Sequence, residues 1–465
     1  MNYKISDFVP RTVLGVVILV SLTACAWATA KETVLHSFGG TGDGAIVEGG
    51  LVADATGNLY GTTASGGSGD NCIIGGCGTV FELSAQQNGT WKETVLYSFL
   101  GGDDGGDPVS SLIFDHEGNL YGTTAQGGVK NCIVGSTPVG CGVVFELSPP
   151  GAPGTAWTET TLYEFTGGSD GSWPQSSLVF DSAGNLYSVT YAGGDLNCME
   201  SIDNNAPGCG TVFKLAPPAV KGGDWTESTL YAFHGGNDGA SPTQESLIVY
   251  GDGTLLGTTS SGGGTSSDCE EEACGTVFAL QQEHSGSWKE TILYRFAFSN
   301  GTSPAEPTGA LVIRQGSIYG TTLYGGNFHG GVVYQLTPSK GMWSFSLIHQ
   351  FGKNSTDGFG PFSGVIADAA GNFYGTTEVG GDANCDYPIG CGAVFELSPP
   401  SGGNENWTET ILWDFEEGKD GGGPVAVPTL LGGSLYGTTV GGGGHDQNCS
   451  TLGFAGCGTV FRLTR

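Results

Sequence analysis

The stretch Asn119-Leu120-Tyr121-Gly122-Thr123-Thr124 determines the fold, because the chain repeats it seven times. The copies are NLYGTT at 58–63 and 119–124, NLYSVT at 185–190, TLLGTT at 254–259, SIYGTT at 317–322, NFYGTT at 372–377 and SLYGTT at 434–439. Consecutive copies start 55 to 69 residues apart. Self-similarity at such a period is the signature of a propeller or another repeat array, so it outranks any single-residue motif.

Each repeat reads as four short β-strands. In the second copy these are residues 111–114, 119–124, 142–147 and 157–165, here called strands A, B, C and D. They are rich in aromatic and β-branched residues and are bounded by turn signals such as DHEG at 115–118. No helical spacing of apolar residues occurs after the N-terminal segment. The sequence therefore predicts an all-β fold.

The two ends of the repeat region indicate a closed ring. Strand D ends seven times, at Phe38, Phe99, Phe165, Phe233, Phe296, Phe351 and Phe415. The chain opens with a D strand at 32–38 and closes with strands A, B and C but no D. In a ring, that first strand completes the last blade and leaves no free edge. We therefore predict one domain over residues 31–465, a seven-bladed β-propeller of four-stranded antiparallel blades closed by its N-terminal strand.

Residues 1–30 stand outside the repeats and read as a signal peptide. Lys4 and Arg11 precede an apolar run at 13–22 that is too short to span a bilayer. Two processing routes remain open. Residues 28–30, Ala-Thr-Ala, form a small-x-small cleavage site, whereas Leu-Thr-Ala-Cys at 22–25 resembles a bacterial lipobox in which Cys25 is lipidated. We expect an exported chain that is periplasmic, secreted or lipid-anchored at the cell envelope.

The net charge of the chain restricts the classes of molecule that it can bind. The formal net charge is −31, and such a field repels nucleic acid, whose binding needs Lys and Arg against phosphate. It also repels anionic membrane surfaces, while it favours cations. No second hydrophobic segment follows the signal, so we expect no transmembrane span in the mature chain. A surface protein or an extracellular glycan is the expected class of partner.

Twelve cysteines beyond Cys25 fall into six local pairs. These are Cys72 with Cys77, Cys132 with Cys141, Cys198 with Cys209, Cys269 with Cys274, Cys385 with Cys391, and Cys449 with Cys457. Each pair lies in the B–C loop of one repeat, and in an exported chain such pairs read as disulfides. Zinc is the alternative, but the separations of 5, 9, 11, 5, 6 and 8 residues do not match the fixed spacing of a structural zinc site.

The phrases GNLYGTT and CGTVFEL, with an Asp-Gly-x-x-Pro turn, carry a resemblance to a known family. They resemble the tandem GloVer-type repeats of bacterial surface proteins that carry varied anchors. The order of strands and turns also resembles NHL-type propeller blades. The first resemblance covers about residues 31–465 and implies an exported repeat protein. It brings no catalytic residues and no cofactor.

A candidate rim follows from the topology. In an antiparallel meander the D–A turns and the B–C loops emerge on one face, and the A–B and C–D connections on the other. The first face would carry the turn residues Asp104, Asp170, Asp238, Asp357 and Asp420. Such residues can bind a polar ligand or a cation, among which Ca²⁺ takes oxygen ligands of this kind. They can equally be turn residues that bond their own backbone, which is the interpretation we favour.

The fifth repeat departs from the others. Its B–C loop, 324–329, is short and has no Cys, and His329 occupies the position of the second Cys. A short loop in a ring of long ones leaves a notch, walled by Tyr324, Phe328 and His329. Aromatic side chains stack on sugars and other flat apolar faces, so these three are candidate ligand-binding residues. A lone His is also compatible with a structural role.

Three functions are compatible with these features. Near-identical blades favour a non-catalytic binding or interaction module at the cell surface or in the periplasm. An enzyme, a hydrolase or lyase acting on an extracellular glycan or lactone, is the second interpretation, but the chain shows no catalytic motif, and a fold does not imply a function. A structural or adhesive surface component is the third.

Overall fold

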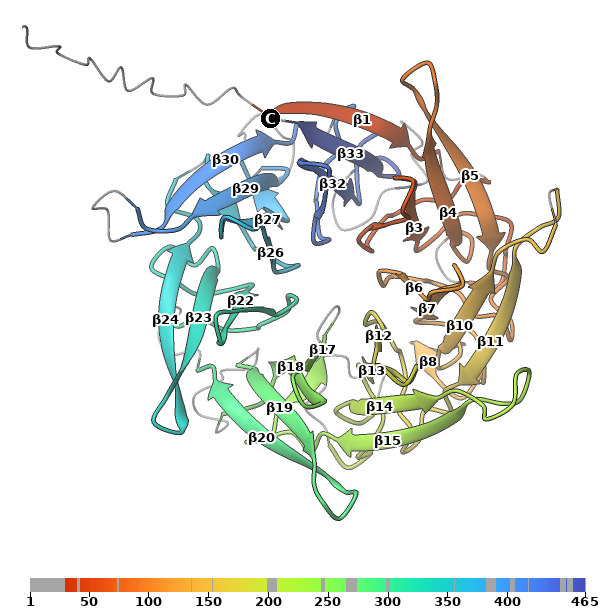
Figure 1. Cartoon of the computed structure of the whole chain (residues 1–465), viewed down its shortest axis with the longest axis horizontal. Helices are drawn as coiled ribbons and strands as arrows, with labels where there is room; N and C mark the ends of the chain where they lie inside the picture. The colour runs from red at the N-terminus through yellow and green to blue at the C-terminus, as the bar shows by residue number, and fades with distance from the viewer. Residues whose placement is uncertain are drawn as a thin grey trace, which may run out of the picture.

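The computed structural model describes residues 30–39, 42–72, 75–134, 136–152, 154–198, 207–243, 247–264, 274–297, 302–354, 356–381, 390–401, 406–416, 418–443, 449 and 455–464. These residues form seven antiparallel sheets that stand radially around one axis, as the blades of a propeller (Figure 1). The predicted fold is confirmed. The signal segment 1–29, Cys25 included, lies outside the described residues.

The four strand types recur once per blade. The A strands are β2 (Val52–Ala53), β6 (Ile113–Phe114), β12 (Val179–Phe180), β17 (Ile248–Tyr250), β21 (Val312–Arg314), β26 (Val365–Ala367) and β31 (Thr429–Leu431). The B strands are β3 (Leu59–Thr63), β7 (Leu120–Thr124), β13 (Leu186–Thr190), β18 (Thr254–Ser261), β22 (Ser317–Thr322), β27 (Phe373–Thr377) and β32 (Ser434–Thr439).

The outer half of each blade holds the C and D strands. The C strands are β4 (Thr79–Ala85), β10 (Val143–Ser148), β14 (Thr211–Ala216), β19 (Thr276–Gln282), β23 (Val332–Ser339), β29 (Ala393–Ser398) and β33 (Thr459–Thr464). The D strands are β5 (Trp91–Ser98), β11 (Thr158–Glu164), β15 (Thr226–Ala232), β20 (Trp288–Arg295), β24 (Met342–Gln350), β30 (Thr408–Asp414) and β1 (Lys31–Ser37). Short extra strands are β8 (Ile133–Val134), β9 (Thr137–Pro138), β16 (Ala240–Pro242), β25 (Gly358–Phe359) and β28 (Val379–Gly380).

The ring closes as the sequence predicts. The last sheet has the order β1-β33-β32-β31, so the first strand of the chain is the outer strand of the seventh blade (Figure 1). β1 pairs with β33 antiparallel, from Lys31 opposite Thr464 to Ser37 opposite Thr459. The Phe38 amide continues the pairing by donating to the Gly458 carbonyl at 3.0 Å.

The core is a ring of aromatic pairs between blades. The Phe that follows each D strand packs edge-on or tilted against an aromatic residue of the next C strand, with ring centroids 4.9–5.2 Å apart at all seven boundaries. Phe99 on Phe145 is one such pair, and both are fully buried. The glycine of the repeated hexapeptide makes room for them, because a Cβ at Gly122 would lie 2.6 Å from Phe145 Cζ.

The A strands are shorter than predicted. The expected strand 111–114 forms ladder bonds only at β6, because the residues before it contact the preceding blade. The Ser110 carbonyl accepts a hydrogen bond from the Thr62 hydroxyl at 3.0 Å, and the Ser111 hydroxyl accepts one from the Gly50 amide at 2.8 Å. These residues therefore join neighbouring blades near the axis instead of lengthening a strand.

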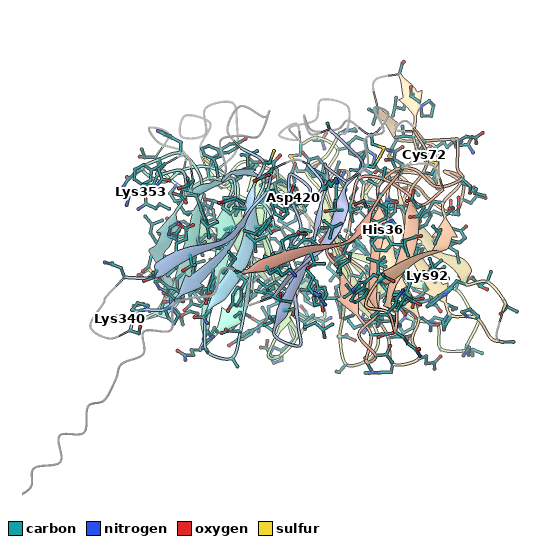
Figure 2. All side chains as sticks on the ribbon, turned by 90° about the horizontal axis from the view of Figure 1, so that it is seen from above. His36, Cys72, Lys92, Lys340, Lys353 and Asp420 are labelled. Atoms are coloured by element: carbon teal, nitrogen blue, oxygen red, sulfur yellow. A yellow bond between two sulfur atoms is a disulfide. The ribbon has the colours of Figure 1, made fainter. Side chains whose placement is uncertain are left out.

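The two faces of the ring differ as expected from the topology. Cys72 of a B–C loop and Lys353 of a D–A turn lie toward one face, and Lys340 of a C–D connection lies toward the other (Figure 2). We call the first the cysteine face. The described residues contain no helix that is long and apolar enough to cross a membrane.

Candidate functional site

Disulfides brace the cysteine face. Four of the predicted pairs are joined, namely Cys72–Cys77, Cys132–Cys141, Cys198–Cys209 and Cys449–Cys457. Cys274 and Cys391 are disulfide-bonded as well, and their predicted partners, Cys269 and Cys385, lie outside the described residues. Disulfides of this kind belong to proteins of oxidising compartments, which indicates an extracellular or periplasmic protein.

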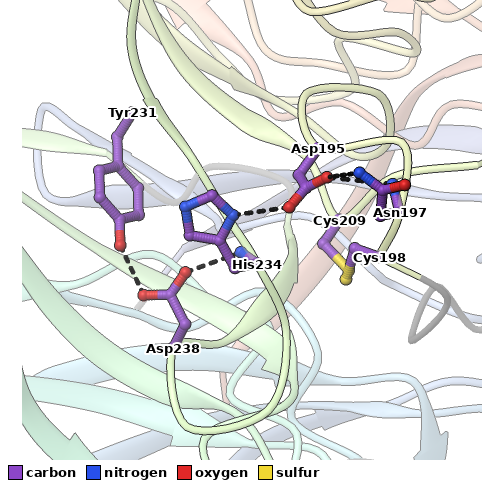
Figure 3. Close-up of polar contacts among 7 residues, drawn as sticks. All are labelled: Asp195, Asn197, Cys198, Cys209, Tyr231, His234 and Asp238. Carbon is purple, nitrogen blue, oxygen red and sulfur yellow. Dashed lines mark hydrogen bonds and ion pairs between the residues drawn. A yellow bond between two sulfur atoms is a disulfide. The ribbon is translucent and has the colours of Figure 1, made fainter.

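Polar contacts tie the cysteine loops to the D–A turns. In the third blade, His234 Nδ1 lies 2.8 Å from Asp195 Oδ2, beside the Cys198–Cys209 disulfide (Figure 3). The same contact lowers the pKa of Asp195, whose other oxygen accepts the Asn197 amide. In this blade the cysteine loop and the D–A turn are therefore joined directly.

The candidate aspartates accept hydrogen bonds from their own turns. Asp104 accepts from the Tyr97 hydroxyl at 3.1 Å, from the Leu100 amide at 2.8 Å and from the Gly102 amide at 3.1 Å. The equivalent donors are Tyr163, Thr166 and Gly168 to Asp170, Tyr231 and His234 to Asp238 (Figure 3), Lys353 to Asp357, and Trp413 and Glu416 to Asp420. These bonds give each residue a role in its turn, and ligand binding by them stays a prediction.

At six of the seven blade boundaries the turn Asp is also coupled to the next blade. Each boundary node joins a Tyr, His or Trp two residues before the D-strand Phe, the turn Asp, and a Glu of the following D strand. The nodes are His36–Asp43–Glu93, Tyr97–Asp104–Glu159, Tyr163–Asp170–Glu227, Tyr231–Asp238–Glu290, His349–Asp357–Glu409 and Trp413–Asp420–Glu32. The remaining boundary, between the fourth and fifth blades, has no such node. There the Tyr294 ring stacks on the Phe345 ring, with centroids 4.8 Å apart.

Burial and the neighbouring turn Asp raise the pKa of five node glutamates. Burial is the larger of these two causes for each of the five. The pKa rises to about 7 for Glu32, Glu93, Glu159 and Glu227, and to about 8 for Glu290. These five glutamates, at the boundaries between blades, are therefore partly protonated near neutral pH.

The node between the fifth and sixth blades is different. His349 Nε2 lies 3.4 Å from Glu409 Oε1 and 4.0 Å from Asp357 Oδ1. Burial alone would lower the pKa of His349, but the two carboxylates together outweigh it and raise the pKa to about 9. Among the described residues this is the one group of three His, Cys, Asp or Glu residues whose ligand atoms lie within 4.8 Å of one another.

The loop that carries the three candidate residues of the fifth blade is exposed, and the notch there stays a prediction. Tyr324 and Phe328 are 42% and 40% exposed, unlike the fully buried aromatics of the core, and His329 is exposed beside them. His329 has a φ of 62°, a conformation that non-glycine residues seldom adopt. Since no disulfide can form in this loop, the Asn327 amide instead donates to Gln350 Oε1 at 2.9 Å.

The notch rests on the turn that follows β24. A Cβ at Gly352 would lie 3.1 Å from the Phe328 carbonyl oxygen and 3.2 Å from Gly330 Cα. Gly352 lies between His349 and Asp357 in the sequence, so the notch loop and the His349 node share one short segment. The structure thus brings Phe328 and Asp357, two of the candidate residues, into the same sector of the cysteine face.

Two other spaces bear on where a ligand could bind. Residues of several blades, among them Glu48, Val109 and Phe362, line a cavity of only about 10 Å³, room for about one water molecule. An open groove of about 670 Å³ lies on the opposite face, between the second and third blades, where Trp225 packs against Tyr121 and Lys221 pairs with Glu117. Its volume is within the range of small-molecule sites.

Sequence reasoning missed His349 and Glu409. The signal was present, because each stands at a fixed distance before a D-strand Phe, two residues for His349 and six for Glu409. Comparing these two positions across the repeats would have singled out the residues, although not the contact between them. It also missed Asp107, the residue before Pro108. Asp107 has a φ of 59°, and burial raises its pKa to about 6.

Comparisons with known proteins agree on the architecture. The family model described as the Gloeobacter/Verrucomicrobia repeat matches residues 17–267 and 200–453. The search of curated proteins finds no match.

Solved structures are similar only in fold. A fungal alcohol oxidase of the AA5 family in complex with copper is 13% identical, with a TM-score of 0.50 over 94% of this chain and 76% of that one. A sialidase variant from Streptococcus pneumoniae is 13% identical, with a TM-score of 0.42 over 93% of this chain and 70% of that one. A putative glucose dehydrogenase from Thermus thermophilus is 12% identical, with a TM-score of 0.41 over 93% and 99%. At such identities the likeness extends to the fold alone.

Proposed function

Because the chain belongs to the Gloeobacter/Verrucomicrobia repeat family, we propose that it is an exported β-propeller that binds a ligand without catalysis, at the notch of its fifth blade. One observation carries the proposal. Tyr324 and Phe328 are exposed on a short loop in a ring whose other loops are long and crosslinked. Exposed aromatic rings held on a rigid scaffold are suited to stacking on a flat partner.

The negative charge of the chain favours neutral or cationic ligands over polyanions. A net charge of −31 repels polyanions and attracts cations. Stacking on Tyr324 and Phe328 suits the apolar face of a sugar ring, and an exposed His329 offers a hydrogen bond to a hydroxyl. We therefore propose a neutral extracellular glycan as the ligand, with a cationic surface protein as the alternative.

Alanine at the notch should weaken binding. We expect Phe328→Ala and His329→Ala each to reduce affinity for a captured neutral glycan by roughly fivefold, since each removes a contact of about 1 kcal/mol. Binding would be measured on a glycan array and then by calorimetry with the best ligand. Neither substitution should alter thermal unfolding, because both side chains are exposed.

Trp225→Ala is the matched control on the opposite face. It removes an aromatic side chain from the groove and leaves the notch intact. Binding that survives both notch substitutions and is lost with Trp225→Ala would move the site to that groove. Turnover of a glycan or lactone substrate would favour an enzyme, and no binding to any array member would favour a structural or adhesive component.

The export route has its own test. If the lipobox is used, Cys25→Ala should move the protein from the membrane fraction to the soluble fraction, because the acyl chains are lost. A chain cleaved after Ala30 should be soluble already and should begin at Lys31. N-terminal sequencing of the mature protein distinguishes the two routes, and a retained residue 1 in an intracellular fraction would contradict export.

A further inference from the structure

We propose that His349, Asp357 and Glu409 form a binding site for one divalent transition-metal ion of the zinc class, which joins the fifth and sixth blades beneath the notch. His349 comes from β24, Asp357 from the turn that follows it, and Glu409 from β30 of the next blade. The site is thus assembled from three segments of two blades.

Three orphaned atoms point at one another in this site. His349 Nε2, Asp357 Oδ1 and Glu409 Oε1 are all buried, and apart from the ion pairs that His349 makes with the two carboxylates none of them has a hydrogen-bond partner. A buried polar atom without a partner costs about 1–3 kcal/mol, so three together at one point call for a common partner. One proton on Nε2 cannot satisfy two separate carboxylate oxygens, whereas a cation between the three atoms satisfies all of them.

The geometry suits a small tetrahedral ion. With bonds of ~2.1 Å, such an ion separates its ligand atoms by roughly 3.4 Å. The distance from His349 Nε2 to Glu409 Oε1 is 3.4 Å, that to Asp357 Oδ1 is 4.0 Å, and all three atoms lie within 4.8 Å of one another. A small inward movement of the Asp357 carboxylate completes the set, and one nitrogen with two oxygens is a donor set that Zn²⁺ accepts.

The ligands are already oriented by their surroundings. Asp357 Oδ2 accepts the Lys353 amide at 2.7 Å, which turns Oδ1 toward His349. The side chain of Asp357 is only 5% exposed, and the His349 ring packs edge-on against Phe351 at 4.6 Å. Partners that hold a ligand in place in this way are typical of metal sites.

The chain carries its own comparison at the boundary of the seventh and first blades. His36, Asp43 and Glu93 are the same residue types at the equivalent positions, yet both Asp43 oxygens lie within bonding distance of the Gly39 amide. Asp43 is also more exposed than Asp357, at 27% of its side chain against 5%. The His36 node therefore lacks the second orphaned carboxylate oxygen, and we expect it to bind no metal.

The test is zinc binding by the intact chain after treatment with a chelator. We expect one Zn²⁺ per chain by elemental analysis and a midpoint of thermal unfolding that rises by a few degrees on adding zinc. His349→Gln and Glu409→Gln should each weaken binding by at least roughly 100-fold, more than the loss of an outer-sphere partner. His36→Gln should bind zinc as the wild type does.

Cobalt supplies a second readout. Co²⁺ in this site should give the absorption of a tetrahedral ion, and Glu409→Gln, which is close in shape to the native residue, should abolish it even if His349→Gln fails to fold. No zinc in the wild type, or zinc retained in both His349→Gln and Glu409→Gln, would overturn the proposal. No glycan takes part, so failure here leaves the notch proposal standing.

Discussion

Deletion of residues 31–38 should prevent the protein from folding into a soluble monomer. The deletion removes β1, which supplies the outer strand of the seventh blade, and leaves the edge of β33 unpaired. It also removes Phe38, which is fully buried and packs on Phe81 at 5.1 Å. Loss of a buried Phe alone costs about 3–5 kcal/mol, a large part of the 5–15 kcal/mol that stabilises a typical domain. The bare edge adds a route to aggregation.

Size-exclusion chromatography and thermal unfolding would measure the effect. A chain that begins at Ala30 is the control, since it keeps every residue of β1. A synthetic peptide of residues 30–39 added during refolding should restore part of the soluble monomer, because it can pair with β33 in trans. A deleted chain that remained monomeric and unfolded at the midpoint of the control would show that the ring does not depend on this closure.

Thermal stability should fall as the pH rises from about 5 to about 8.5. Five node glutamates have a pKa of about 7 or 8 in the folded chain, against an ordinary value of 4.5. The folded state therefore binds more protons than the unfolded state between these values. The stability from these protons is fully present below about pH 4.5 and is lost as the pH rises through about 7 to 8. Below about pH 4 the trend reverses, because hydrogen bonds lower the pKa of Asp54, Asp115, Asp181 and Asp368 in spite of burial.

The size of the effect can be bounded. Each node glutamate is partly exposed, so we discount its shift for solvent and expect about 1 kcal/mol or less per node, roughly 3 kcal/mol in all. Repulsion within a chain of net charge −31 acts in the same direction. Denaturant unfolding at pH 5.5, 7 and 8.5 would measure it.

Glu290→Gln isolates one node. The amide mimics the protonated acid, so the variant should be more stable than the wild type at pH 8.5 and equal to it near pH 5. Glu117→Gln is the control, because the Glu117 side chain is 73% exposed and belongs to no node. Stability that rose steadily from pH 5 to pH 8.5 in the wild type would contradict the raised pKa of the node glutamates.

The candidate site was only partly readable from the chain. The irregular, exposed loop of the fifth blade could be predicted, because a missing Cys pair and a shortened loop are visible in one repeat read against six others. The blade-boundary nodes could not be read so directly, since His349 and Glu409 are 60 residues apart and look like ordinary surface residues of two separate strands. Their meeting depends on how neighbouring blades dock.

The third blade shows the same division. The sequence places Ser188 and Val189 where other repeats have Gly and Thr, which reads as a departure from the pattern. In the structure the Ser188 hydroxyl donates to the Ser176 carbonyl at 3.1 Å, a carbonyl that also accepts from Thr123 of the second blade. Val189 has no hydroxyl group, whereas Ser188, one residue earlier, has one that makes this hydrogen bond. The residue types alone do not predict this contact.

By itself the sequence determined the ring, its seven blades, the closing strand and the local cysteine pairs. It could do so because turn chemistry, strand alternation and the repeat are local properties that recur seven times. Only the tertiary structure decided which side chains share a boundary and which atoms there are left without partners. The reason is that contacts between blades depend on the docking of whole sheets, which places His349 of the fifth blade 3.4 Å from Glu409 of the sixth.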